Sequence, residues 1–292
     1  MITANNYQTY LRRMTESYDN TTKSLIPFYS AQAVRDLRDP RILDVGIGSG
    51  VVGKGLRAMI PNAEIYGIDM VQDNINEAPE GIYDHLVTGK FEEYSGGETR
   101  FDAIVFSSVL HEIGSYSATD RFGEAPVRTA LLHAHSLLKP GGVTIIREGL
   151  AENESRCGEP VLAKLCTEQD AAALMRFFRE RPLIENGEHP EIRQLPEKVP
   201  SDGTYDYLVP RDLLREFLCT WTWGEKSWGR EIRERFCYFS AAKWDALLSE
   251  CGFDVITDIR SPEEYPKYFR KIIANYETDF PFVGVFVGRK GS

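Results

Sequence analysis

Long hydrophobic runs are missing from this sequence of 292 residues. No stretch reaches the roughly eighteen consecutive apolar residues that a membrane-spanning helix needs. The first residues, Met1–Gln8, also lack the basic segment and apolar core of a secretion signal. We therefore expect a soluble cytoplasmic protein without a membrane partner.

Positive charge is scarce as well, because 34 Lys and Arg stand against 44 Asp and Glu, which gives a formal net charge of −10. Nonspecific affinity for nucleic acid depends on Lys and Arg that neutralise phosphates, so this balance disfavours a nucleic-acid partner. The oligomeric state is not encoded in any feature of the composition.

Cysteine is infrequent, and the five cysteines form no C-x-x-C pair; they are Cys157, Cys166, Cys219, Cys237 and Cys251. An odd number without paired spacing argues against a disulfide framework or a structural zinc site. We expect free, buried thiols and no metal. The 42% hydrophobic and 27% charged residues are ordinary for a globular protein, and the length suits one large α/β domain with an elaboration.

Glycine, in contrast, is concentrated in one stretch, Arg41–Gly53. There an apolar run ends in Asp44 and is followed by Gly46, Gly48, Gly50 and Gly53. This pattern predicts a strand, a tight turn and a helix over about 51–59 whose N-terminal amides face a ligand. The last three glycines also satisfy the G-x-G-x-x-G spacing of dinucleotide-binding proteins, so the turn alone leaves the cofactor open.

A second predicted strand, Glu64–Asp69, ends in an acid about twenty residues beyond the turn. A carboxylate at Asp69 would accept hydrogen bonds from both hydroxyls of a ribose, which NAD and S-adenosylmethionine both carry. The thioether of Met70 would lie against an adenine face, although methionine is also a common space-filler.

Two further segments carry a specific resemblance. Phe101–Ser108 and Leu137–Gly142, the latter followed by Val143–Ile146, resemble the fourth strand and the turn into the fifth strand of class I S-adenosylmethionine-dependent methyltransferases. The resemblance covers about 25–148 and 240–290. It implies a seven-stranded Rossmann-like sheet with helices on both faces, and S-adenosyl-L-methionine as the cofactor. The run Phe280–Gly288 would be the family's seventh strand, antiparallel between strands five and six.

The resemblance also implies cofactor contacts, at Asp44, Gly46, Gly48, Gly50, Asp69, Met70 and Ser107. N-terminal helices of such proteins often fold over the cofactor, and Tyr18 and Lys23 would meet its carboxylate or methionine chain; alternatively they only pack a helix against the domain. Lys90 stands where many family members have an acid that holds the adenine amino group. Backbone groups there and the Phe91 ring are then the expected adenine contacts.

Polar residues follow the fourth and fifth strands at the edge where ligands of open α/β sheets bind. We predict that His111, with help from Glu112 or Glu148, removes the acceptor's proton, because histidine titrates near neutral pH and a carboxylate stabilises its protonated form. The alternative is that His111 only braces its loop.

Residues 150–238 are far longer than one crossover requires and should form a mainly helical cap after strand five. Helical periodicity is present at about 160–179 and 210–222. We expect Trp223, Trp228 and Arg233 to bind the acceptor, unless the tryptophans form the cap's own core. The expected units are an N-terminal lid (1–37), a cofactor-binding core (38–149 and 239–292) and the cap (150–238).

The predicted function is methyl transfer from S-adenosylmethionine to oxygen or nitrogen of a small molecule, by in-line displacement. RNA or protein as the acceptor, and a cofactor-binding protein without transfer, are the alternatives. An NAD-dependent oxidoreductase and transfer of a group other than methyl also stay open at this stage.

Overall fold

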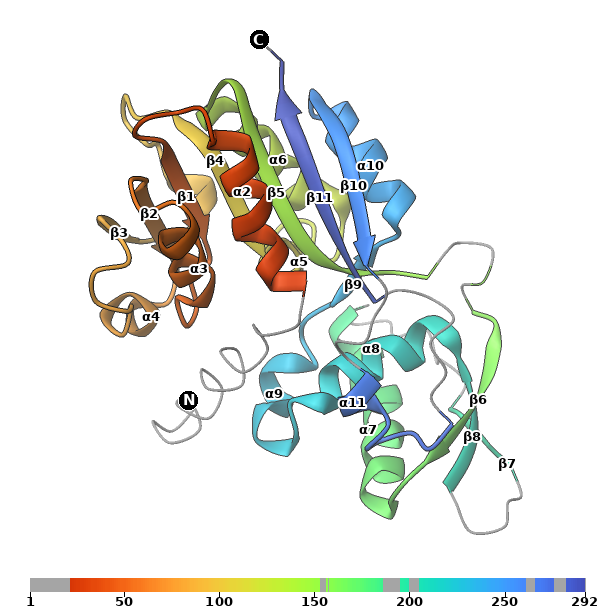
Figure 1. Ribbon diagram of the computed structural model, residues 1–292. Helices are drawn as coiled ribbons and strands as arrows, with labels where there is room; N and C mark the ends of the chain where they lie inside the picture. Colours follow the sequence, from red (N-terminus) through yellow and green to blue (C-terminus); the bar gives the residue numbers. More distant parts are fainter. Residues whose placement is uncertain are drawn as a thin grey trace.

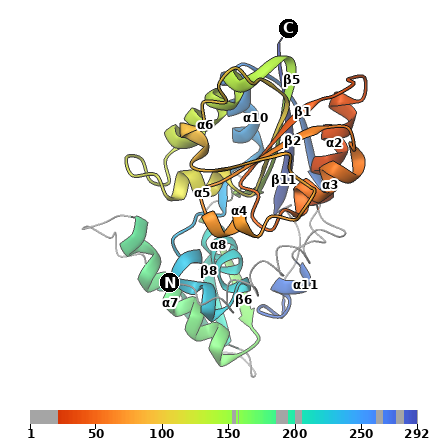
Figure 2. The same cartoon turned by 90° about the vertical axis from the view of Figure 1, so that its left-hand side faces the viewer.

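A computed structural model describes residues 22–152, 156, 158–185, 195–199, 205–260, 266–275 and 282–291. The chain forms a lobe built on a large sheet and a second lobe beneath it (Figures 1 and 2). The second lobe is made mainly from the insertion after β5, and we call it the cap. No helix among the described residues is both long and apolar enough to cross a membrane.

The large sheet has the strand order β10-β11-β5-β4-β1-β2-β3, and β9 pairs with the end of β5. The strands are β1 (Arg41–Val45), β2 (Glu64–Asp69), β3 (His85–Thr88), β4 (Phe101–Ser107), β5 (Leu138–Leu150), β9 (Cys237–Phe239), β10 (Phe253–Arg260) and β11 (Val283–Lys290). β11 is antiparallel to both neighbours, β5 and β10. The prediction of a seven-stranded sheet with an antiparallel strand between strands five and six is therefore confirmed.

Helices cover both faces of this sheet, as expected. On one face α2 (Leu25–Val34) and α3 (Val51–Met59) pack on Ile42 and Val105, and on the other α6 (Glu124–Leu137) and α10 (Ala241–Glu250) pack on Leu43 and Phe106. Neighbouring residues of β1 belong to different clusters because successive side chains of a strand point to opposite faces. The short helices α4 (Gln72–Asn76), α5 (Leu110–Ser115) and η2 (Phe91–Glu93) follow β2, β4 and β3, and η1 (Thr22–Ser24) precedes α2.

The cap contains more strand than the helical periodicity predicted. Its elements are β6 (Pro160–Leu165), α7 (Glu168–Glu185), β7 (Glu197–Val199), β8 (Tyr205–Pro210), α8 (Arg211–Thr222), η4 (Glu225–Ser227) and α9 (Trp228–Glu231). The helix expected from about residue 160 begins only at Glu168, because the preceding residues pair with β8 in an antiparallel sheet of order β6-β8-β7. The helix predicted over about 210–222 is α8.

The cap has its own hydrophobic cluster, and the C-terminal part of the chain contributes to it. Phe269 of α11 (Pro266–Phe269) is fully buried in this cluster, and Ile273 bridges to Leu165 of β6. The sequence had assigned this stretch to the cofactor-binding unit, whereas it packs in the cap. The division of the chain into three units stays a prediction.

Candidate functional site

The glycine turn after β1 has the conformation that only glycine adopts readily. Gly46, Gly48 and Gly50 have φ values of +70°, +50° and +70°. A Cβ atom on Gly46 would lie 2.6 Å from Cγ2 of Val109. The turn therefore leaves bare backbone at the carboxyl edge of the sheet and packs directly against the segment that follows β4.

Asp69 closes the other side of this turn. Its carboxylate is buried and accepts hydrogen bonds from the amides of Gly48 (3.0 Å) and Val71 (2.8 Å) and from the side chain of Asn74 (2.9 Å). Met70, beside it, is 59% exposed. The carboxylate is thus fixed next to the turn, and an exposed apolar side chain lies beside it, an arrangement that suits a ribose and an adenine.

Asp44 is held by a residue that the sequence did not indicate. The hydroxyl of Tyr83 donates to Oδ2 of Asp44 over 2.7 Å. Burial raises the pKa of Asp44 to about 7, although the hydrogen bond from Tyr83 lowers it. A Cβ atom on Gly53 would lie 2.3 Å from the Tyr83 hydroxyl, so the fourth glycine of the motif makes room for this tyrosine.

The remaining predicted cofactor residues differ in their surroundings. Lys90 is exposed and lies 3.9 Å from Glu93, whereas the Phe91 ring is buried between Phe106 and His133. Ser107 ends β4, and its hydroxyl is buried with no hydrogen-bond partner among the residues that the structure describes. Lys23 lies in η1, before α2. Tyr18 is outside the described residues.

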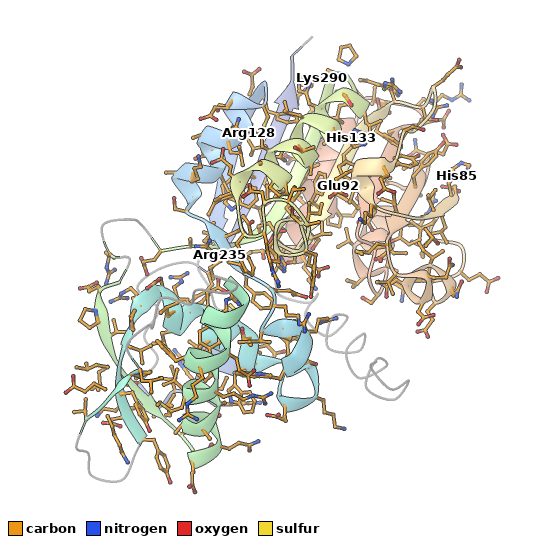
Figure 3. The ribbon with its side chains drawn as sticks, turned by 180° about the vertical axis from the view of Figure 1, so that it is seen from behind. His85, Glu92, Arg128, His133, Arg235 and Lys290 are labelled. Atoms are coloured by element: carbon orange, nitrogen blue, oxygen red, sulfur yellow. The ribbon has the colours of Figure 1, made fainter. Side chains whose placement is uncertain are left out.

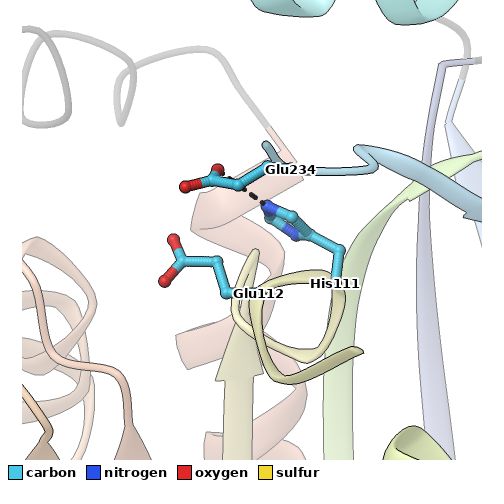
Figure 4. A group of neighbouring side chains, drawn as sticks. All are labelled: His111, Glu112 and Glu234. Atoms are coloured by element: carbon cyan, nitrogen blue, oxygen red, sulfur yellow. Dashed lines mark ion pairs between the residues drawn. The ribbon is translucent and has the colours of Figure 1, made fainter. Parts of the chain in front are cut away.

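Three side chains from both lobes meet beyond the end of β4 (Figure 4). His111 and Glu112 come from α5, and Glu234 follows α9 in the cap. One ligand atom from each lies within 4.8 Å of the others. Nε2 of His111 is 3.8 Å from Oε2 of Glu234, and its Nδ1 is 2.8 Å from Oε2 of Glu148. The predicted catalytic residues are therefore brought together, and Glu234 joins them.

Glu148, on β5, fixes the beginning of α5. Its Oε1 accepts hydrogen bonds from the amides of Val109 (2.8 Å) and Leu110 (2.7 Å), while Oε2 faces the His111 ring. The side chain is fully buried. A carboxylate at a helix N-terminus satisfies amides that have no partner within the helix. Glu148 thus orients both the helix and the imidazole.

The charges of this cluster perturb one another. Burial lowers the pKa of His111, but Glu148 and Glu234 outweigh it, so this pKa lies well above 6.5. Burial and the charge of Glu234 raise the pKa of Glu112 to about 8, and the same two causes raise the pKa of Glu231 to about 8. Strongly shifted groups at a sheet edge are typical of functional sites.

Glu234 is held by both lobes. Its Oε1 accepts a hydrogen bond from the hydroxyl of Tyr116 (2.9 Å) and lies 3.8 Å from Nε of Arg230. Its backbone carbonyl accepts from Nη1 of the buried Arg181 over 2.6 Å. No periodicity or motif in the sequence points to Glu234, because its place depends on how the cap packs on the sheet.

The predicted acceptor residues of the cap do not share one environment. Trp228 is 2% exposed; it packs on Trp221, stacks with Arg176 and donates to Oε2 of Glu180 over 2.7 Å. Both tryptophans therefore belong to the cap's core, as the alternative interpretation held.

The other two predicted acceptor residues lie nearer the surface. Trp223 is partly buried at the end of α8, and Arg233 is exposed, with a backbone carbonyl that accepts from Arg121 over 3.1 Å. Arg235 lies where the cap meets the sheet lobe (Figure 3). Nε2 of His133, on α6, donates to the carbonyl of Tyr94 over 2.8 Å, which gives this residue a structural contact (Figure 3).

This strand order, the bare glycine turn and the acid at the end of β2 define a class I S-adenosylmethionine-dependent methyltransferase. Residues 10–258 match a family model described as a methyltransferase domain, and the chain belongs to that family. The turn, which a Cβ atom would fill, and the fixed carboxylate of Asp69 fit S-adenosyl-L-methionine as the cofactor.

Two solved structures with TM-scores above 0.5 show the same fold, and a third is less similar. The CurJ carbon methyltransferase superimposes with a TM-score of 0.53 at 16% identity, over 97% of this chain and 58% of that chain. The plantazolicin methyltransferase BpumL, in complex with a triazolic desmethylPZN analog and SAH, gives 0.52 at 11% identity, over 97% and 91%. Human N-acetylserotonin methyltransferase in complex with SAM gives 0.49 at 14% identity, over 98% and 56%. The chain thus spans little more than half of two of these proteins. No curated protein matches the sequence.

Proposed function

We propose that this methyltransferase acts on a small-molecule acceptor and methylates an oxygen or nitrogen atom. The observation that carries this proposal is the buried pair of His111 and Glu148 beside the glycine turn, at an edge covered by the cap. A covered site suits a compact acceptor, and a net charge of −10 disfavours a polyanionic one. RNA and protein are the alternative acceptors.

The cofactor supplies a methyl group on a positively charged sulfur. The protein then has to align the nucleophile with that methyl carbon and accept the proton that the nucleophile loses. Asp69, the glycine turn and the backbone near Lys90 would hold the cofactor. His111 would take the proton on Nε2, because Nδ1 faces Glu148. The resulting imidazolium would lie between Glu148 and Glu234.

An untargeted screen tests the function. The protein is incubated with cofactor labelled in its methyl group and with separated metabolite, nucleoside and protein fractions, and the labelled product is identified by mass. We expect label in a small molecule, and much less label with Asp69→Ala at a cofactor concentration that does not saturate this variant. Label only in RNA or protein would mean that the acceptor is one of these macromolecules and not a small molecule. Binding of the cofactor without any transfer would favour a protein that only binds the cofactor.

A further inference from the structure

We infer that the acceptor is a primary amine, bound as its ammonium ion by Nε2 of His111 and the carboxylates of Glu112 and Glu234. This inference rests on the proposed function and names its substrate class. It assigns Glu234, a cap residue, to the acceptor site.

The number of hydrogen-bond acceptor atoms in the cluster matches the number of N–H donors on the ligand. A primary ammonium has three N–H donors, and the cluster offers one atom from each of three side chains, all within 4.8 Å of one another. Nδ1 of His111 faces Glu148 at 2.8 Å, so the neutral ring donates there and directs the lone pair of Nε2 into the cluster. The ring is therefore oriented as an acceptor whenever it is neutral, which its raised pKa places at a pH above neutrality.

The spacing admits an ammonium as well as a metal ion. Hydrogen bonds of about 2.8 Å from a tetrahedral nitrogen place their acceptors about 4.6 Å apart. Ligands about 2.1 Å from a metal ion lie about 3 Å apart in an octahedral site and about 3.4 Å apart in a tetrahedral one. The 3.8 Å between Nε2 of His111 and Oε2 of Glu234 lies between these values, so the binding experiments below include a metal ion.

The charge of the site also selects a cation. Glu148 lies behind the ring and Glu231 beside Glu234, while Arg230 contacts both Glu231 and Glu234. Among the described residues, Glu112 has no hydrogen-bond or ion-pair partner and is only partly buried. One imidazole and one guanidinium thus face four carboxyl groups. Burial and the charge of Glu234 raise the pKa of Glu112 and of Glu231 to about 8, so a bound cation would stabilise their charged forms.

The cluster lies where a methyl acceptor would bind, next to the proposed cofactor site. Val109, two residues before His111, packs on Gly46 of the glycine turn, and the carboxylates of Glu112 and Asp69 lie close enough to influence each other's charge. An amine in the cluster would therefore be adjacent to the proposed cofactor site. No such cluster is needed for an alcohol, which has a single O–H donor.

The transfer step balances without another reactant. The ammonium gives one proton to Nε2 of His111, and its nitrogen then attacks the methyl carbon of the cofactor. The carbon–sulfur bond breaks with its electron pair on sulfur, which leaves the neutral thioether. The product is a secondary ammonium, and His111 later loses its proton to solvent.

Binding can be tested before the natural acceptor is known. The protein saturated with S-adenosylhomocysteine is titrated with n-butylamine, n-butanol and n-butyltrimethylammonium, and the side-chain NMR signals of His111 are followed. These signals are assigned by their loss in His111→Asn. We expect saturable changes with n-butylamine alone, because butanol lacks the charge and the trimethylated ion lacks N–H donors.

Two variants test the geometry. Glu112→Gln and Glu234→Gln should each weaken n-butylamine binding about 10- to 100-fold, the range for one hydrogen bond to a charged group. Glu231→Gln removes the same charge nearby but none of the three acceptor atoms, and it should weaken binding several-fold less. Melting temperatures verify that the variants fold, and Glu112 is the safer position because it has no partner to lose.

Several results would overturn the inference. One is equal binding of butanol or of the trimethylated ion; another is a loss in Glu231→Gln as large as in Glu234→Gln. Mn²⁺ that binds in dependence on Glu112 and Glu234, detected by its EPR signal, while n-butylamine does not bind, would make the cluster a metal site. Methylation of oxygen alone in the product screen would contradict an amine but leave the proposed function standing. If no acceptor is methylated, the proposed function fails independently of the titration.

Discussion

Asp69 combines two tasks in one buried carboxylate. It holds the amide of Gly48 in the turn and, in our proposal, the ribose of the cofactor. Asp69→Ala should weaken S-adenosylmethionine binding by about 1.5 to 3 kcal/mol, the usual value of hydrogen bonds to a charged group. Calorimetry measures this effect, and Asp73→Ala on the neighbouring helix α4 is the control. An unchanged affinity would remove Asp69 from the cofactor site.

His111 accepts a proton only in its neutral form, and the carboxylates of Glu148 and Glu234 raise its pKa well above 6.5. The neutral fraction therefore grows as pH rises above neutrality, and turnover should rise with it. Glu234→Gln removes one of these charges, lowers the pKa and should move the rise to lower pH. The free acceptor titrates equally with both proteins, so the difference in kcat/KM profiles, which follow the free enzyme, reports on His111. Identical profiles, or near-normal turnover in His111→Ala, would exclude this role.

The cofactor half of the site could be predicted from the sequence because it is local. Asp44 and Asp69 lie at the carboxyl ends of two neighbouring strands and the glycines follow the first strand directly, so their order alone puts them at one edge. Tyr83 and Glu234 could not be found that way. Tyr83 lies in a loop 39 residues from Asp44, and Glu234 reaches His111 only after the cap has packed on the sheet.

The position of helix α5, which follows β4, depends on a residue of the neighbouring strand β5. Glu148 accepts hydrogen bonds from the amides of Val109 and Leu110 and orients His111. Glu148→Ala should lower the free energy of unfolding by about 3 to 5 kcal/mol, because it leaves a buried charge and two amides without their partner. Urea denaturation measures the loss. Glu92→Ala, an exposed residue of η2, should change stability little, and an equally small effect at Glu148 would contradict this account.

The strands of the large sheet other than β9 could be predicted because most of them are apolar runs bounded by turn residues. The cap was harder. Residues 160–165 alternate between exposed and buried positions, but six residues are too few to separate that period from the start of a helix, so β6 was expected to be helical. Its partner β8 lies about 45 residues further on, beyond the reach of local pattern.

The cap as a whole should influence the acceptor more than the cofactor. Its core is separate from the two clusters that flank the large sheet. Arg233→Ala and Trp223→Ala, which lie outside the cap's fully buried core, should raise the acceptor's KM or lower turnover without a matching change in cofactor affinity. Trp228→Ala is the contrasting variant, because loss of a buried tryptophan should cost about 3 to 5 kcal/mol of stability. If all three simply unfold the protein, the cap residues are structural.

The two lobes are joined at the segment that carries Glu234, and Arg181 fixes that segment from α7. Its guanidinium is buried and donates to the carbonyls of Ile232 (3.1 Å) and Glu234 (2.6 Å). Arg181→Met keeps most of the side-chain volume but removes these donors. The segment should then lose its fixed position against His111, so turnover should fall at least tenfold while calorimetry finds cofactor affinity unchanged. Arg179→Met, at an exposed position of the same helix, controls for the loss of a positive charge. Because the glycine turn and Asp69 lie in the other lobe, an equal loss of cofactor affinity in Arg181→Met would mean that the cap shapes both halves of the site.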